Sequence, residues 1–293
     1  MRARVKRRQR NRRLMIIGVA VLLIAIFAVS AYYLSLPSSL DAYDNKPVVS
    51  STMVGLSAAS APPYGAEGAA LDGLVRNTTG SLTSIGKPVV LYVGEEGCPY
   101  CAEMRWSLVL ALMRFGNFTN LAYMTSSLDG TDYPTFTFHG STYQSNYLVF
   151  APYELADRAG NTLQTLPANY QSIFNSLSIG GGVPFADFGG KYYTPGALLP
   201  TGYTTNNLTP LFGSKNWTQV IASINSGDSL GSLVKAGANV LTATFCKLTG
   251  GLPSNVCQQS PINQLGPVAL SLGGPSVATN ILVVAPERPS ITR

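Results

Sequence analysis

The chain has few charged side chains. Asp, Glu, Lys and Arg make up 12% of its 293 residues, about half of the usual share of roughly 25%. Eight of the 20 basic residues lie within residues 1–13, so the remaining 12 face all 14 acidic residues and leave the rest of the chain at −2. A nucleic-acid-binding protein needs a basic face on its folded part. This balance leaves no charge for such a face, and the sequence predicts no nucleic-acid partner.

Histidine and cysteine are also scarce. The only histidine, His139, ends an alternating segment, which predicts a strand-end position rather than a catalytic base. The four cysteines form two local pairs, Cys98 with Cys101 and Cys246 with Cys257. A zinc knuckle needs a C-x-x-C at each end of the site, and the eleven-residue separation of the second pair does not supply it. The sequence therefore predicts no metal and no other cofactor.

One stretch near the N-terminus lacks charge altogether. Residues 14–40 contain no charged side chain, and most of the first half is continuously apolar. About 20 apolar residues span a bilayer, so we expect a transmembrane anchor over 14–36. The basic residues 1–13 should then stay in the cytoplasm, and the protein would be a single-pass cell-membrane protein with its C-terminal domain outside the cytoplasm. A cleaved signal peptide ending near 28–31 is the alternative.

Further patterns agree with an extracytoplasmic domain. An even number of cysteines in local pairs is typical of oxidising compartments. Asn-x-Ser/Thr triplets, which are candidate glycosylation sites, occur at Asn77, Asn117, Asn207 and Asn216. Such triplets also arise by chance in a Thr-rich chain, so each site is a hypothesis.

The rest of the chain divides by composition. Residues 37–66 are rich in Ser, Ala, Pro and Gly and are expected to form a linker. The main domain is expected over 67–228 with an insertion at 130–178, and a helical extension that carries the second cysteine pair over 229–293. The apolar run 88–93 predicts a central strand covered on both faces. Helices are expected at 164–177, 216–225 and 230–247.

The feature that carries chemistry is Cys98-Pro99-Tyr100-Cys101. The motif lies where the apolar strand gives way to helical spacing that continues to Phe115. At the start of a helix, unpaired N–H groups and the helix dipole favour a thiolate, the reactive form of cysteine. Cys98 is therefore the expected nucleophile, and Cys101, one turn further in, the expected resolving thiol.

Neighbours of the motif leave its reactivity open. Glu95 and Glu96 should oppose thiolate formation, because nearby carboxylates disfavour a second negative charge. Arg105 and Trp106 could border a substrate groove or lie on the helix surface. The direction of electron flow cannot be read from the motif.

The order strand, C-x-x-C, helix, strand, insertion, helix, Val183-Pro184, hairpin and helix resembles the thioredoxin fold over roughly residues 68–228. Pro-Tyr between the cysteines is similar to glutaredoxins. With the anchor and the later cysteine pair, the chain resembles an uncharacterised archaeal family of membrane-anchored thioredoxin-like proteins.

The resemblance implies an α/β, thioredoxin-like fold. The fold would carry an insertion between its second strand and the cis-Pro loop and a helical C-terminal extension, and one transmembrane helix would precede it. It also implies that Pro184 is cis and that its loop packs against the active-site disulfide. Val183 would then offer backbone groups to a substrate strand, while Pro99 and Tyr100 would tune the thiolate and the approach of substrate.

These observations predict a membrane-anchored, extracytoplasmic thiol–disulfide oxidoreductase. Its partners would be cysteine-containing exported proteins or a membrane redox partner. The alternatives are a non-catalytic binding or scaffold module with only structural disulfides, and a metallochaperone. For Cys246 and Cys257 we expect a structural disulfide, with a second redox pair as the alternative.

Overall fold

The computed structural model describes residues 15–27, 40–68, 71, 73–128, 130–213 and 215–265. The architecture is mixed α/β with several sheets. The chain divides into two compact units, Met1–Ser39 and Leu40–Arg293, and every strand among the described residues lies in the second.

The expected transmembrane helix is not found. In the first unit, residues 15–27 are helical, and the rest of the expected span, residue 14 and residues 28–36, lies outside the described residues. Within the described ranges no helix is both long and apolar enough to cross a membrane. The prediction of a transmembrane helix over 14–36 preceding the α/β fold is therefore wrong. The single-pass placement with an extracytoplasmic domain, which depended on that helix, is corrected with it.

The largest sheet has six strands and is centred on β3 (Lys87–Gly94). Its order is β1-β10-β9-β3-β2, with β8 paired to β3 outside this path. β3 runs parallel to β8 (Val149–Glu154) and antiparallel to β9 (Phe185–Phe188). Gly94 lies opposite Glu154 in this register, so the chain leaves β3 beside the C-terminal end of β8.

The other elements surround this sheet. The remaining strands are β1 (Arg76–Asn77), β2 (Thr83–Ser84) and β10 (Tyr192–Thr194) of the same sheet, the pair β4 (Gly116–Thr119) and β7 (Thr142–Ser145), and the pair β5 (Ala122–Leu128) and β6 (Thr131–Thr137). The helices are η1 (Asp41–Tyr43), α2 (Ser50–Ser60), α3 (Pro99–Met113), α4 (Ala168–Leu177), α5 (Thr205–Phe212), α6 (Trp217–Ser226), α7 (Ser229–Leu248) and α8 (Ser254–Cys257).

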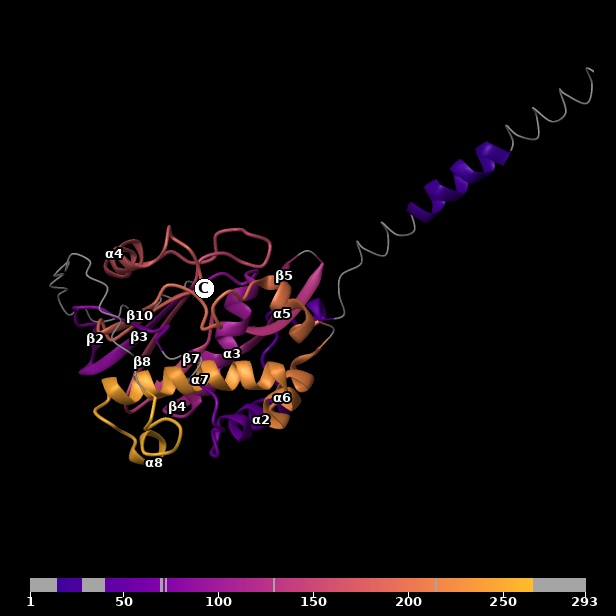
Figure 1. Cartoon of the computed structure of the whole chain (residues 1–293). Coiled ribbons are helices and arrows are strands. Elements are labelled where there is room, and N and C mark those ends of the chain that lie inside the picture. The colour runs from indigo at the N-terminus through magenta and orange to yellow at the C-terminus, as the bar shows by residue number, and fades with distance from the viewer. Residues whose placement is uncertain are drawn as a thin grey trace, which may run out of the picture. The chain divides into compact units, whose positions relative to one another are not determined.

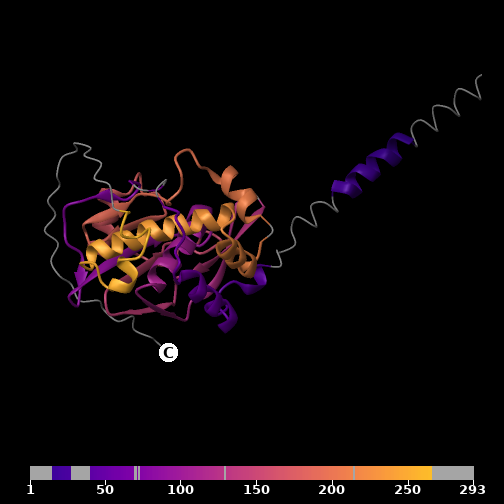
Figure 2. The same cartoon turned by 60° about the horizontal axis from the view of Figure 1, so that its bottom comes forward.

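Both faces of β3 are buried, as its continuous apolar run predicts. Val89, Leu91 and Val93 pack into a cluster with residues of α4. Val90 and Tyr92 point the other way, into the larger cluster formed with α3 and α7. Figure 1 accordingly shows α4 on one side of the sheet and α7 on the other, and in Figure 2 α7 is the long orange helix that comes forward.

Helix α3 lies in the centre of the larger cluster. Cys98 is its N-cap and Pro99 its first residue, a position that tolerates proline because the missing N–H has no partner in the helix. Of its fifteen residues only Tyr100 and Met113 are not buried. Apolar residues on every side are typical of a helix enclosed by protein. The helix ends at Met113, two residues before the end of the helical spacing at Phe115, and Gly116 begins β4.

Three segments expected at the periphery contribute to the core. In the expected linker 37–66, α2 has Leu56 fully buried, and the Arg114 side chain donates to the Ser60 carbonyl at 3.2 Å. The expected insertion 130–178 supplies β8, a direct neighbour of β3. The expected extension from 229 begins with α7, which packs along α3. The sequence did not predict this packing, because runs of small residues and prolines in these segments obscure the apolar pattern.

Several helix boundaries agree closely with the sequence patterns. The expected helices at 216–225 and 230–247 correspond to α6 and α7, while α4 begins at Ala168, after Pro167. Gly189-Gly190 forms the turn between β9 and β10. At this turn both glycines have positive φ, which favours glycine.

Cys246, near the end of α7, and Cys257, in α8, are joined by a disulfide, as expected. The bond closes a short loop at the edge of the larger cluster, and both residues are buried. A loop of this length restricts the unfolded chain by roughly 3 kcal/mol.

Replacing both residues, Cys246→Ala with Cys257→Ala, should therefore lower the free energy of unfolding by roughly 3 kcal/mol, measured by urea unfolding. Alkylation of Cys98 in the folded variant should keep its rate, because the bond acts on the unfolded chain. Loss of Cys98 reactivity with unchanged stability would instead favour a redox relay between the pairs.

Candidate dithiol site

The motif forms the N-terminal turn of α3. Cys98 and Cys101 are not bonded to each other, and the backbone N–H of Cys101 donates to Cys98 Sγ at 3.3 Å. Cys98 is partly exposed, whereas Cys101 is fully buried. Opposite them, the Val183 carbonyl oxygen accepts a contact from Cys98 Sγ at 4.0 Å. The Val183–Pro184 peptide bond is cis, as the resemblance implies.

The two thiols have opposite acidities. Hydrogen bonds from Cys101 lower the pKa of Cys98 most, and they outweigh the partial burial of that thiol. Burial raises the pKa of Cys101 well above its ordinary value. Cys98 therefore has the greater tendency to ionise, and a thiolate there is the nucleophilic form.

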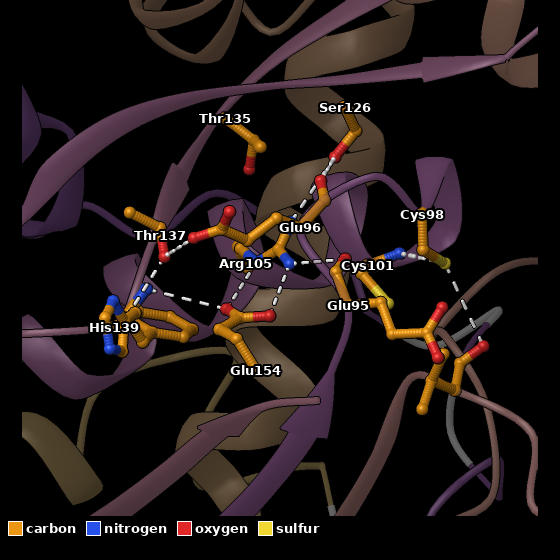
Figure 3. Close-up of polar contacts among 12 residues, drawn as sticks. Glu95, Glu96, Cys98, Cys101, Arg105, Ser126, Thr135, Thr137, His139 and Glu154 are labelled. Carbon is orange, nitrogen blue, oxygen red and sulfur yellow. Dashed lines mark hydrogen bonds and ion pairs between the residues drawn. The ribbon is translucent and has the colours of Figure 1, made fainter. Parts of the chain in front are cut away.

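A buried ion pair lies behind the motif. The guanidinium of Arg105 binds Glu154 through two hydrogen bonds, Nε to Oε1 at 2.9 Å and Nη2 to Oε2 at 2.6 Å. Both side chains are fully buried. Nη2 also donates to the Glu95 carbonyl oxygen at 2.7 Å, and Figure 3 shows the guanidinium beside Glu95 and Cys101. The pair thus joins α3, the end of β8 and the loop that leads into the motif.

A second polar cluster extends from this pair. Arg105 Nη1 donates to Ser126 Oγ at 3.4 Å, and that hydroxyl donates to the Glu96 carbonyl oxygen at 2.5 Å. The Glu96 carboxylate accepts from Thr137 Oγ1 at 2.6 Å. Burial raises the pKa of Glu96, and in Figure 3 its side chain is directed toward Thr137 rather than toward Cys98.

The positions of Glu96, Arg105 and Trp106 decide two expectations about the residues next to the motif. Glu96 does not prevent thiolate formation, because its carboxylate bonds to Thr137 and the pKa of Cys98 is lowered despite it. Arg105 and Trp106 are both fully buried, so they neither border a groove nor lie on the helix surface. Trp106 Nε1 donates to the Pro134 carbonyl oxygen at 2.8 Å, which fixes the indole against β6.

A pocket of about 340 Å³ lies beside the motif. Tyr100, Val183 and Pro184 line one part of it, whereas Pro99 does not; that these residues meet substrate stays a prediction from the resemblance. The other part comes from the segment 196–203, between β10 and α5. The backbone N–H of Thr205 donates to the Tyr100 hydroxyl at 3.2 Å, so α5 holds the tyrosine ring in place at the pocket.

The other candidate residues lie outside this site. His139 is exposed just after β6, the strand-end position expected for it. The candidate glycosylation sites are all exposed: Asn77, Asn117, Asn207 and Asn216. Throughout the described residues there is no group of three or more His, Cys, Asp or Glu side chains that could hold a metal ion.

Sequence reasoning missed Glu154 and the segment 196–203. Glu154 ends an apolar strand and resembles any solvated strand end in the sequence. One signal was present for its partner: Arg105 is the only basic residue of a largely apolar helix, and a buried arginine needs an acidic partner.

Comparison with known proteins gives one match. A family model described as a domain of unknown function (DUF929) matches residues 74–178, which include the motif, Arg105 and Glu154. The match covers little more than a third of the chain. A search of curated proteins found no match, and neither did a search of solved structures.

The acidities predict unequal labelling of the two thiols. In the reduced protein, iodoacetamide should modify Cys98 much faster than Cys101, and the rate should rise with a midpoint below the ordinary pKa of a cysteine. The measurement is mass-spectrometric mapping of the modified peptides across a pH series. Cys98→Ser should abolish the fast labelling. Equal and slow labelling of both thiols would contradict the assigned roles.

Proposed function

We propose that this protein is a thiol–disulfide oxidoreductase that acts on cysteine-containing peptides or proteins through Cys98 and Cys101. The observation that carries the proposal is the asymmetry of the pair. A partly exposed thiol of lowered pKa caps a helix, and a buried thiol of raised pKa lies one turn behind it. Disulfide exchange needs this combination of an accessible nucleophile and a protected resolving group.

The exchange has two balanced steps. The Cys98 thiolate attacks one sulfur of a substrate disulfide, a bond forms between them, and the other substrate sulfur leaves with the electron pair. Cys101 then attacks Cys98 Sγ, the Cys98–Cys101 disulfide forms, and the second substrate sulfur leaves. The proton that Cys101 gives up ends on this departing sulfur. The substrate is reduced by two electrons and the protein is oxidised by two; the reverse sequence oxidises a substrate dithiol.

We also propose that the domain is related to the thioredoxin-like superfamily. The arrangement around β3 supports this relation: β8 lies parallel on one side, and β9 lies antiparallel on the other. The motif follows β3 directly, and Val183-Pro184 precedes β9.

Unbonded cysteines support exchange over the alternative of a binding module whose disulfides are all structural. The contrast with Cys246–Cys257, which is bonded, supports separate roles for the two pairs. The pocket beside Tyr100 supports a peptide substrate, because a chain that reaches Cys98 would pass the Val183 carbonyl and place a neighbouring side chain in the pocket.

The deciding experiment uses single-cysteine variants and a disulfide-containing peptide. Cys98→Ser should abolish exchange, and Cys101→Ser should accumulate the mixed disulfide between peptide and Cys98, because no resolving thiol remains. Non-reducing mass spectrometry measures both. If Cys101→Ser traps no peptide while wild type also leaves the peptide oxidised, the protein is not an oxidoreductase for such substrates.

Filling the pocket should slow exchange with peptides selectively. Thr201 is exposed on the pocket's edge, so Thr201→Trp should leave folding intact and block entry of a substrate side chain. We expect a several-fold lower kcat/KM for a peptide disulfide and an unchanged rate of Cys98 alkylation by iodoacetamide, with Thr201→Ser as the control. Equal rates for Thr201→Trp and wild type would exclude the pocket as the peptide site.

A further inference from the structure

The resolving step places a charge where the protein excludes water. Cys101 must become a thiolate to attack the mixed disulfide at Cys98, yet its side chain is fully buried. A buried anion is costly unless a positive charge compensates it. This inference rests on the proposed function and concerns the group that supplies the positive charge next to the Cys101 thiolate.

We propose that the buried Arg105–Glu154 pair is the counter-charge of the motif: the guanidinium stabilises the Cys101 thiolate in the resolving step, and Glu154 limits that stabilisation. Arg105 is a positioning residue in this assignment. It makes no bond to the substrate and does not transfer a proton.

Helix geometry places the guanidinium next to the resolving thiol. Arg105 follows Cys101 by four residues, which puts the two side chains on the same face of α3 one turn apart. Side chains in a helix lean toward its N-terminus, so a long side chain covers the preceding turn. Nη2 reaches far enough to bond the Glu95 carbonyl, ahead of the motif, and Figure 3 shows it beside Cys101.

The charges around the motif leave Arg105 as the cation that acts on both thiols. It lowers the pKa of Cys98 and that of Cys101. The titratable groups packed nearby on the other elements are Tyr92 of β3, Glu95 and Glu96 of the connecting loop, Glu154 of β8, and His139, which follows β6 and acts on Glu96. Of these groups, only His139 can carry a positive charge, and it is exposed. The backbone of Arg158 lies against Gly97, but its guanidinium is bound by three carboxylates, those of Asp41, Asp44 and Asp132.

Tyr92 is the main rival for this role. Its hydroxyl is buried and has no hydrogen-bond partner among the described residues. Burial raises the pKa of Tyr92 most, and the nearby Cys101 and Cys98 raise it further. A hydroxyl could donate to a thiolate without any contribution from Arg105. Tyr92→Phe removes the hydroxyl and keeps the ring, so it separates the two possibilities.

The test follows the resolving step directly. Reduced protein is mixed with one equivalent of dithiobis-nitrobenzoate, an aromatic disulfide that releases a coloured thiolate at each exchange, so that no free reagent remains to react with Cys101. The first release reports attack by Cys98, and the second reports resolution by Cys101. Both rates are measured by stopped-flow absorbance across a pH series, on the full chain.

The proposal predicts different changes in the rate of the second release for variants of the ion pair. Arg105→Met leaves Glu154 buried without its partner and can fail to fold. The double variant Arg105→Met with Glu154→Met avoids this, because replacing a whole buried ion pair by apolar residues is often neutral for stability. In the double variant the second release at neutral pH should slow roughly tenfold, the low end of the effect of one nearby opposite charge. Its pH midpoint should also move upward.

Glu154→Gln removes the opposing charge and keeps Arg105, so its second release should be as fast as in wild type or faster. Arg114→Met is the matched control: Arg114 is a buried arginine at the other end of α3, and it bonds Asn239 and Thr242 rather than the motif. This control should lose stability and keep the wild-type second release.

A second release in the folded double variant within twofold of wild type at every pH would overturn the proposal. Slowing in Glu154→Gln, or equal slowing in Tyr92→Phe, would overturn it as well, because either result assigns the effect to packing or to the hydroxyl. Failure of the proposed function looks different: wild type itself would release only one equivalent, with no second phase to compare.

Discussion

The enclosure of α3 is the constraint on which the rest of the structure depends. Apart from Tyr100 near its start and Met113 at its end, every residue of this helix is buried, so each polar side chain between them must find its partner inside the protein. Arg105 binds Glu154 of β8, Trp106 binds the Pro134 carbonyl of β6, and Ser107 donates to the Val234 carbonyl of α7 at 3.2 Å. These bonds orient the surrounding elements and leave Cys98 as the exposed end of an otherwise inaccessible helix.

The same enclosure explains why the two cysteines differ although they are three residues apart. At the N-cap, Cys98 receives the N–H of Cys101 and the favourable end of the helix dipole. Cys101, one turn further into the helix, has no contact with water, so its acidity depends on the charges that the fold places near it. The acidity of each thiol is therefore a property of its depth along the helix. The residues between the cysteines contribute the proline that begins the helix and the tyrosine that lines the pocket.

The sequence was sufficient for the parts of the structure that depend on local patterns. The central strand, the helix after the motif, α6, α7 and the hairpin at Gly189-Gly190 follow from apolar spacing and turn residues. Parts that depend on distant contacts were missed. Residues 50–60 form a helix because Leu56 and its neighbours pack against α3 and α6, and no local pattern shows those partners. Val149–Glu154 joins the sheet centre by pairing with a strand about sixty residues earlier, which spacing within the segment cannot reveal.

The residues of the candidate site also differ in whether a local sequence pattern could identify them. The motif and Val183-Pro184 were recognised because their residue types are unusual in that context. Glu154 and the segment 196–203 carry no such signature, and only the fold brings them to the motif. The uncharged stretch 14–40, with its apolar first part, misled in the opposite way: its composition is that of a membrane span, yet within the described residues no helix long and apolar enough to cross a membrane is found.

Glu103 is a buried carboxyl of α3 whose protonation makes the stability of the folded protein depend on pH. This carboxyl is fully buried between α3 and α7, and burial raises its pKa to about 8. Ser107 bonds one of its oxygens at 3.0 Å, and the other has no partner within the described part of the chain. At neutral pH the folded protein therefore keeps a proton on Glu103 that the unfolded chain has released. Because the folded state binds this extra proton between about pH 4.5 and 8, stability falls as pH rises through that window.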